Sequence, residues 1–164
     1  MAIGAQGVHH IAVSVPDIAK ARTFYIELLG AVEEVPPLRW RDNPFIDALV
    51  GLPGSVAEQF ICRLGNTHIE VFEYHAPRSD AQDPNRGVNQ FGYTHFALQV
   101  EDIAAACARL KAAGIRLHAE PDLGTITHHA DGSKTGFCAV YARDFFGNAF
   151  ELIEIHPNPG IKPI

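Results

Sequence analysis

The stretch His10-Ile-Ala-Val-Ser-Val-Pro-Asp17-Ile returns 85 residues later as His95-Phe-Ala-Leu-Gln-Val-Glu-Asp102-Ile. Each half then ends on a second matching stretch, Ile69-Glu70-Val-Phe-Glu73 in the first and Phe150-Glu151-Leu-Ile-Glu154 in the second. The closing stretches are 81 residues apart, so the separation is nearly constant. Such a period indicates a duplicated supersecondary unit. A histidine opens each copy, and a glutamate closes it.

Each opening stretch has the pattern of one strand followed by one helix. Around His10 apolar and less apolar residues alternate, which is the period of a strand with one buried face. Asp17 stands where a helix N-cap is expected, apolar residues then recur at helical spacing, and Gly30 ends the run. Asp102 and Gly114 bound the same pattern in the second copy. We expect each helix to cover the more apolar strand face, so that the histidine face points the other way.

Three further strand candidates follow each helix. They span 31–36, 56–64 and 67–74 in the first half, and 116–120, 136–143 and 149–155 in the second. Glycine-asparagine pairs predict a tight turn before each last strand. The chain is therefore predicted to be an α+β protein made of two tandem βαβββ modules. Strand parity places Glu70 and Glu151 on one face of their strands, and Glu73 and Glu154 on the opposite face.

Several stretches have no counterpart in the other half. Pro36–Ser55 contains Arg39, Trp40 and Arg41, which are candidates for binding a carboxylate or phosphate or for a solvated loop. The stretch 120–134 is predicted to be a long loop. The predicted organisation is a single domain, with module one at about 7–75, a linker at about 76–91, module two at about 92–156 and a tail at 157–164.

Composition limits the classes of function. The chain has 164 residues and a net charge of −6, which argues against nucleic acid or an anionic membrane as a partner. No apolar run approaches the roughly 18 residues of a membrane span, and the start of the chain lacks the features of a signal peptide. Three widely spaced cysteines fit small core residues in a reduced compartment better than a disulfide framework. We expect a cytoplasmic protein that binds a small-molecule substrate.

The duplicated histidines and glutamates are candidate metal ligands. A single histidine near a strand start is usually structural, but two at equivalent positions, each with a glutamate partner, favour a divalent metal site. The sequence leaves open the roles of four other histidines. His9 is expected to pack or cap, His68 to lie behind the ligands or simply to be a polar residue near them, and His128 and His129 to be solvated or to serve as an acid or base.

The whole set of motifs resembles the vicinal oxygen chelate superfamily, which includes glyoxalase I, methylmalonyl-CoA epimerase, extradiol dioxygenases and the fosfomycin and bleomycin resistance proteins. The resemblance rests on the stretches quoted above together with Phe24-Tyr25, Leu28-Leu29-Gly30 and Arg143-Asp-Phe-Phe-Gly-Asn-Ala-Phe-Glu151. Phe145 is a departure, because family members usually carry proline there. The resemblance implies a cup-shaped mixed β-sheet formed by the two modules, with helices on its outer face.

The resemblance also implies that His10, Glu70, His95 and Glu151 hold one divalent metal ion, with Ni, Co, Zn, Mn and Fe all open. Two imidazoles and two carboxylates leave room for a substrate that chelates through two oxygens, with the metal as a Lewis acid. Glu70 and Glu151 are the candidate catalytic bases for moving a proton on the adjacent carbon. We therefore expect a lyase or isomerase of glyoxalase or epimerase type. We also expect a homodimer, by analogy with the family and because Phe45, Leu49 and Leu52 have no evident cover.

Three other functions stay open at this level. An extradiol Fe(II) ring-cleavage dioxygenase uses two histidines and one carboxylate, and Tyr141 resembles the placement of its catalytic tyrosine, although we favour a core role for Tyr141. A non-catalytic drug-binding or small-molecule-binding resistance protein would not need four candidate ligands. A thiol transferase of the fosfomycin-resistance type would have histidine where this chain has Glu70.

Overall fold

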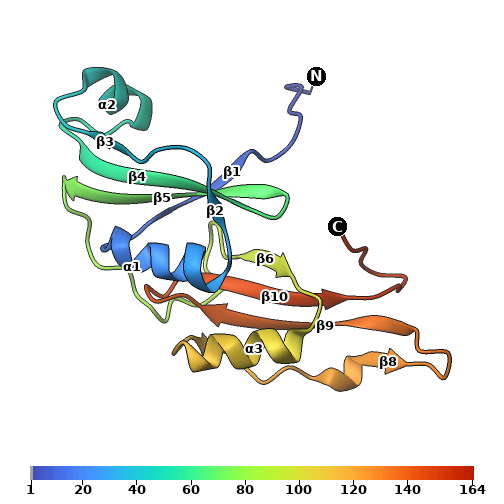
Figure 1. Ribbon diagram of the computed structural model, residues 1–164. Helices are drawn as coiled ribbons and strands as arrows, with labels where there is room; N and C mark the ends of the chain where they lie inside the picture. The colour runs from blue at the N-terminus through green and yellow to red at the C-terminus, as the bar shows by residue number, and fades with distance from the viewer. Residues whose placement is uncertain (1) are drawn as a thin grey trace. The chain divides into compact units, whose positions relative to one another are not determined.

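The computed structural model describes residues 2–164, which form two compact units, one ending at Ala81 and one beginning at Gln82. The first unit contains β1 (His10–Ser14), α1 (Ile18–Arg22) with a π-helical continuation η1 (Thr23–Leu28), β2 (Val32–Glu33), β3 (Leu38–Trp40), α2 (Pro44–Val50), β4 (Val56–Leu64) and β5 (Thr67–Ala76). Its sheet has the order β1-β5-β4-β2, and β3 also pairs with β4 (Figure 1). β1 runs parallel to β5, whereas β4 and β5 are antiparallel.

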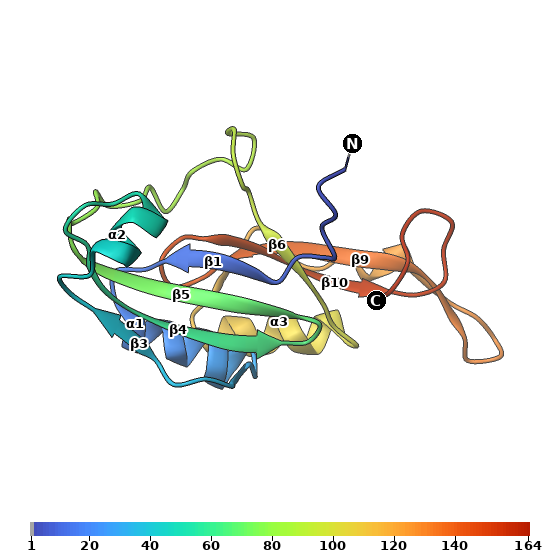
Figure 2. The same ribbon diagram turned by 90° about the horizontal axis from the view of Figure 1, so that it is seen from above.

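The second unit repeats this plan. It contains β6 (Phe96–Gln99), α3 (Ile103–Ala112), β7 (Arg116–Leu117), the short helix η2 (Leu123–Thr125), β8 (Ile126–His128), β9 (Lys134–Arg143) and β10 (Ala149–Ile155). Its sheet has the order β6-β10-β9-β7, and β8 also pairs with β9. β10 lies between β6 and β9 (Figure 1), and Figure 2 shows the equivalent strand β5 between β1 and β4 of the first unit. The predicted α+β class and duplicated βαβββ plan are therefore confirmed.

Both helices begin at the predicted caps. Asp17 accepts a hydrogen bond from the backbone N–H of Lys20 at 2.8 Å, and Asp102 accepts one from Ala105 at 2.8 Å. An aspartate at this position satisfies a backbone donor that the helix itself leaves unpaired. The same acid in the same place thus fixes the point where each strand turns into its helix.

A second acidic residue ties each helix to the last strand of its own unit. Glu73 of β5 accepts a hydrogen bond from the backbone N–H of Ile18 at 2.8 Å, and Glu154 of β10 accepts one from Ile103 at 2.9 Å. Their side chains therefore lie on the helix-covered faces of the sheets. This assigns a structural role to the glutamates that strand parity set apart from the candidate ligands.

The core of each unit lies between the sheet and its helix. In the first unit the fully buried residues include Tyr25 from η1 and Ile69 and Val71 from β5. In the second unit Ile103 from α3 packs in the same layer as the buried residues of β9 and β10. All three cysteines are buried and free, and burial raises the pKa of the Cys62 thiol to about 11. They behave as small apolar core residues.

The unrepeated stretch 36–55 is more regular than the sequence suggested. β3 extends the first sheet by pairing with β4, and α2 follows it. Asn43 caps α2 by accepting from the N–H of Ile46, Pro44 occupies the first turn, and Gly51 ends the helix with φ of 68°. The Asn-Pro start and the glycine stop are helix signals, but the helix is too short to show an apolar period.

The prediction of a long loop over 120–134 was wrong in part. The short helix η2 and the strand β8 occupy its middle, and β8 pairs with the start of β9. Backbone pairing to an existing strand stabilises three residues that have little strand pattern of their own. None of the helices in residues 2–164 is long and apolar enough to cross a membrane.

Candidate metal and proton-transfer site

The first unit places one histidine beside one glutamate on two neighbouring strands of its sheet. β1 and β5 are parallel and in register, with Ala12 opposite Glu70, so His10 and Glu70 emerge from the same face. Their atoms Nε2 and Oε2 lie 3.2 Å apart. The carboxylate is largely covered, since only 17% of the Glu70 side chain is exposed, whereas the imidazole is 40% exposed. Both groups remain reachable by a ligand.

The second unit builds the same pair from equivalent positions. His95 directly precedes β6, and Glu151 stands opposite Ala97 in the parallel pairing of β6 with β10. The distance from His95 Nε2 to Glu151 Oε2 is 3.1 Å. The side chains are 25% and 14% exposed. The duplication therefore extends from backbone topology to the relative placement of these two polar groups.

Tyr141 distinguishes the second pair from the first. It lies opposite Glu151 in the β9–β10 ladder, and its hydroxyl is 3.2 Å from His95 Nε2. The position opposite Glu70 in the first unit is Ile61. The sequence favours a core role for Tyr141. The side chain is instead only half-buried and contacts a candidate ligand, because the register of two antiparallel strands brings it there.

The surroundings of Tyr141 keep its hydroxyl protonated. Burial raises its pKa, and the negative charge of Glu151 raises it further. Burial and the charge of Glu70 likewise raise the pKa of Tyr74 in the first unit. Each candidate glutamate thus has a neutral phenol near it, and a neutral phenol can donate a hydrogen bond to an oxygen of a ligand.

The other nitrogen of each candidate histidine has a close neighbour. His95 Nδ1 is 2.9 Å from the hydroxyl of Thr94, and His10 Nδ1 is 2.9 Å from His9 Nδ1. Such contacts orient a ring and leave Nε2 directed at the glutamate. His9 also stacks on His68 at 5.1 Å, and His68 Nε2 lies 3.3 Å from a carboxylate oxygen of Glu34. His9 is therefore exposed and contacts His10, instead of packing in the core.

His128 and His129 lie on the exposed hairpin formed by β8 and β9. His129 Nε2 is 2.9 Å from the hydroxyl of Thr135 within that hairpin. His118, which no motif in the sequence marks, stacks on Tyr141 at 6.1 Å between ring centres. Burial lowers the pKa of His118, and the nearby Arg143 and Arg116 lower it further, so its imidazole is neutral near neutral pH.

The donor chemistry of these pairs fits a divalent metal ion. Imidazole nitrogen and carboxylate oxygen bind such ions at about 2.0–2.2 Å, so neighbouring ligands of one ion are about 3 Å apart, like the atoms of each pair. The first unit adds a buried acceptor on the face of Glu70, because Gln59 stands opposite Phe72 in the ladder. Among residues 2–164, Gln59 Oε1 is the single buried side-chain nitrogen or oxygen without a hydrogen-bond partner. An unsatisfied acceptor there suits a site that receives a cation or a donor group.

Each unit supplies one imidazole and one carboxylate. Across the residues that the structure describes, no three His, Cys, Asp or Glu side chains form a metal-holding cluster. The assignment of His10, Glu70, His95 and Glu151 as ligands of one ion therefore stays a prediction.

Comparison with known proteins defines the class. The family model described as the Glyoxalase/Bleomycin resistance protein/Dioxygenase superfamily matches residues 7–152. The chain belongs to this superfamily, as its motifs suggested. Its fold resembles that of a glyoxalase family protein from Bacillus cereus, with a TM-score of 0.78 at 21% identity over 96% of this chain and 99% of the other.

Two relatives share more of the sequence. The chain is 32% identical to a 2-epi-5-epi-valiolone epimerase from Actinomyces sp. over 155 residues, which are 93% of this chain and 81% of that protein. It is 31% identical to an ethylmalonyl-CoA/methylmalonyl-CoA epimerase from Cereibacter sphaeroides over 155 residues, which are 90% of this chain and 97% of the relative. The chain is thus a distant homologue of epimerases.

Proposed function

We propose that this protein is a metal-dependent isomerase of epimerase type, which moves a proton on a carbon next to a carbonyl group of a small molecule. The observation that carries the proposal is the pair of equivalent imidazole–carboxylate contacts, 3.2 Å in one unit and 3.1 Å in the other. The kinship to two epimerases supports this choice among the reactions of the superfamily. We propose His10, Glu70, His95 and Glu151 as the metal ligands.

A divalent ion held by these side chains would polarise a substrate carbonyl as a Lewis acid and so acidify the adjacent C–H bond. The chain's own groups then handle the proton. Glu70 and Glu151 are carboxylates with little exposure to water, and a carboxylate can accept a proton from carbon when it lies beside it. Inversion of one carbon requires that the proton leave one face and be returned to the other. Two equivalent carboxylates match that requirement, with one as base and the other as acid.

Tyr141 gives the second unit an additional role. Its neutral hydroxyl lies 3.2 Å from His95 and can donate a hydrogen bond to a substrate oxygen on which negative charge develops. Ile61, at the equivalent position of the first unit, can make no such bond. We propose that this difference orients the substrate, with its carbonyl oxygen toward Tyr141.

Exchange of a substrate proton with solvent tests the proposal. The wild type should incorporate deuterium from D₂O into 2-epi-5-epi-valiolone or into a methylmalonyl or ethylmalonyl thioester, the substrates that the relatives' names indicate. Glu70→Gln and Glu151→Gln should retain the fold and slow exchange by about 10²–10⁴-fold at the true base. Glu73→Gln is the matched control, because Glu73 caps a helix on the opposite face, and it should exchange at the wild-type rate. No exchange on any of these substrates by the metal-loaded wild type would contradict the proposal.

A second candidate function is favoured by one contact. A tyrosine hydroxyl beside a candidate histidine ligand also suits an Fe(II) ring-cleavage dioxygenase, which would consume O₂ with catechols. Oxygen uptake by the Fe(II)-loaded protein with a catechol, without solvent exchange, would replace the epimerase proposal by this one.

A further inference from the structure

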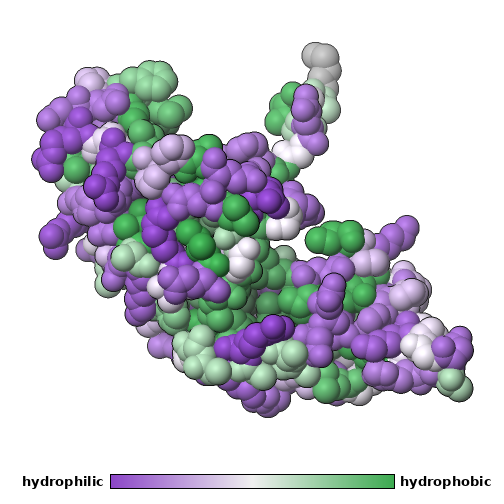
Figure 3. Space-filling view, viewed as in Figure 1, coloured by the Kyte–Doolittle hydropathy of each residue, from purple (hydrophilic) through white to green (hydrophobic). Residues whose placement is uncertain are grey.

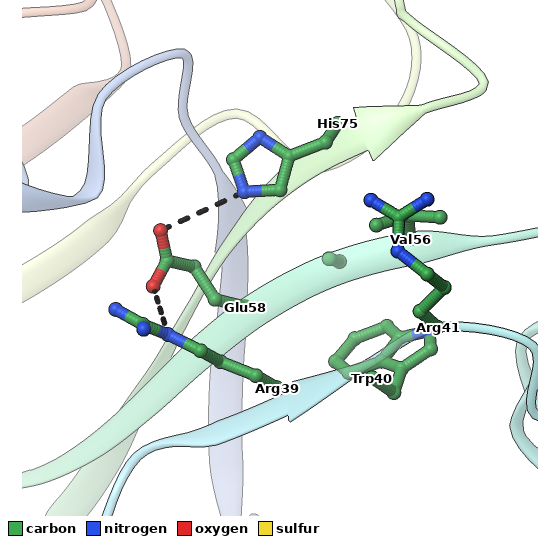
Figure 4. Close-up of a pocket in the computed structure, with 7 residues that line it drawn as sticks. Arg39, Trp40, Arg41, Val56, Glu58 and His75 are labelled. Atoms are coloured by element: carbon green, nitrogen blue, oxygen red, sulfur yellow. Dashed lines mark hydrogen bonds and ion pairs between the residues drawn. The ribbon is translucent and has the colours of Figure 1, made fainter.

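The first unit contains a pocket that the proposed reaction does not use. It has a volume of about 460 Å³ and lies where β3, β4 and the end of β5 meet. Its lining residues are Arg39, Trp40, Arg41, Val56, Ala57, Glu58 and His75 (Figure 4). β8 takes the place of β3 in the second unit, but the stretch 36–55 has no counterpart in sequence there, so the side chains of this pocket are particular to the first unit.

One wall of the pocket is held in place by neighbouring side chains. Trp40 is 7% exposed, and its indole N–H donates to the hydroxyl of Ser55 at 2.7 Å. Ser55 in turn donates through its backbone N–H and its hydroxyl to Asp47 of α2. The indole also makes edge contacts with Phe72 and Tyr74. These contacts fix the segment that carries Arg39 and Arg41 before any ligand arrives, which reduces the entropy lost on binding.

The charged side chains of the pocket leave a positive surplus. Glu58 accepts from Arg39 Nε at 2.7 Å and lies 3.6 Å from His75 Nε2, so Figure 4 shows it between the two. Arg41 forms no hydrogen bond, ion pair or ring contact with any residue of the described chain. The pocket thus contains two guanidinium groups and one carboxylate, in a chain whose net charge is −6. Local positive charge on an acidic protein favours an anion at that point.

Strand register separates this charged group from the candidate metal ligands. Arg39 pairs with Glu58, and Glu58 pairs with Glu73, whose side chain caps α1. Arg39 and Glu58 therefore lie on the helix-covered side of the sheet, whereas Glu70 lies on the other. Trp40 pairs with Ala57, and Ala57 pairs with Tyr74, so the Trp40 ring lies on the Glu70 side and anchors β3 from there. A ligand held by the arginines would bind on the helix-covered side, apart from the candidate metal ligands.

We propose that this pocket binds the oxyanion group, a phosphate or a carboxylate, of a small molecule. Arg41 is the main ligand, since its guanidinium has no competing partner and can donate two parallel N–H bonds to such a group. The remaining N–H groups of Arg39 add to it, with Nε held by Glu58. Val56 of β4 also lines the pocket and offers an apolar contact for the rest of the ligand.

The chain carries its own reporter for this site, because Trp40 is its single tryptophan. We would titrate the protein at low salt with pyrophosphate, inorganic phosphate and malonate, and follow indole fluorescence, with sodium chloride at equal ionic strength as the reference. A saturable change with pyrophosphate or phosphate would identify a phosphate-bearing ligand, and one with malonate alone a carboxylate. Saturable binding should weaken as salt is added, because screening reduces the attraction.

Three variants distinguish specific binding in this pocket from nonspecific electrostatic attraction of anions to the protein. Arg41→Gln should weaken binding by about tenfold or more, the loss expected for one charged hydrogen-bonding partner. Glu58→Gln should tighten it, since removal of the negative charge frees Arg39. Arg109→Gln, an exposed arginine on α3 of the other unit, is the matched control and should bind as the wild type does.

The proposal is independent of the metal site, so His10→Ala should bind the oxyanion with unchanged affinity. It would be overturned by a fluorescence response no larger than that to chloride. The proposal would also be overturned if Arg41→Gln and Arg109→Gln weakened oxyanion binding equally, because the affinity would then depend only on the net charge of the protein.

Discussion

Removing the carboxylate of Glu154 should destabilise the protein more than removing that of its counterpart Glu73. Glu154 is 4% exposed and has three partners: the N–H of Ile103 at 2.9 Å, His156 Nε2 at 2.7 Å and Lys134 Nζ at 3.3 Å. A hydrogen bond to a charged group contributes about 1.5–3 kcal/mol, and loss of a helix N-terminal acceptor costs about 1 kcal/mol. Lys134 is partly exposed and regains water when its partner is lost. We therefore expect Glu154→Ala to lower the free energy of unfolding by about 3 kcal/mol.

Glu73→Ala provides the matched comparison. Glu73 accepts from the N–H of Ile18 at 2.8 Å, but its other neighbour, His75, is 3.6 Å away and its side chain is 21% exposed. Its loss should cost about 1 kcal/mol, the usual value for one cap. The loss of unfolding free energy in Glu154→Gln should lie between the losses in the two alanine variants, because an amide oxygen still accepts from Ile103 but carries no charge.

The pH dependence of the free energy of unfolding provides a second, independent test of the Glu154 contacts. Burial by itself would raise the pKa of Glu154, but hydrogen bonds from Ile103, His156 and Lys134 outweigh it and hold the pKa below the usual 4.5. A carboxyl group whose pKa is lower in the folded state contributes stability that is full above 4.5 and is lost as the pH falls through the folded pKa. The difference between wild type and Glu154→Gln should therefore be largest near neutral pH and shrink in acid.

Urea denaturation followed by circular dichroism measures these free energies. The reasoning would be refuted if Glu73→Ala and Glu154→Ala were equally destabilising. The assigned charge interactions would be refuted if the difference in unfolding free energy between wild type and Glu154→Gln stayed constant from neutral pH into acid.

Three further predictions concern the site and the assembly. Tyr141→Phe should leave metal content unchanged and reduce turnover by about tenfold or more, as the loss of one hydrogen-bond donor to developing charge does; wild-type turnover would show that the hydroxyl does not touch substrate. A chelator should lower the melting temperature and added divalent metal should restore it, because a ligand of the folded state alone stabilises that state; an unchanged melting temperature would argue against a bound ion. Phe45 and Leu49 of α2 are 76% and 73% exposed, where Figure 3 shows apolar surface, so sedimentation should give a dimer of the 17.9 kDa chain, and a monomer at all concentrations would contradict this.

The repeated architecture could be predicted because its signals are local. The alternation around His10 and His95, the acid at each cap and the glycine after each helix recur at fixed separations, and each has one structural meaning. Strand parity also assigned the faces of the glutamates, since a strand alternates its side chains with a period of two. Those local rules place each candidate histidine and glutamate on one face.

What the sequence did not reveal depends on strand register. Tyr141 stands opposite Glu151 only because β9 and β10 pair in one particular register, and nothing near Tyr141 in the sequence marks that alignment. The roles of Glu73 and Glu154 likewise require that the end of each last strand lie beside the start of its helix. β3, α2 and β8 are too short to show a period, so their stability comes from pairing and packing that a pattern of residues does not display.

The most direct test of the account is the metal content of the chain purified without chelator. Elemental analysis should find one divalent ion per chain in the wild type and in Glu73→Ala, and a large loss in Glu70→Ala and in His95→Ala. Equilibrium dialysis against the same metal then gives the affinities of the four proteins. Absence of a stoichiometric ion from the wild type in both measurements, or loss of the ion from Glu73→Ala with retention in Glu70→Ala, would contradict the assigned site.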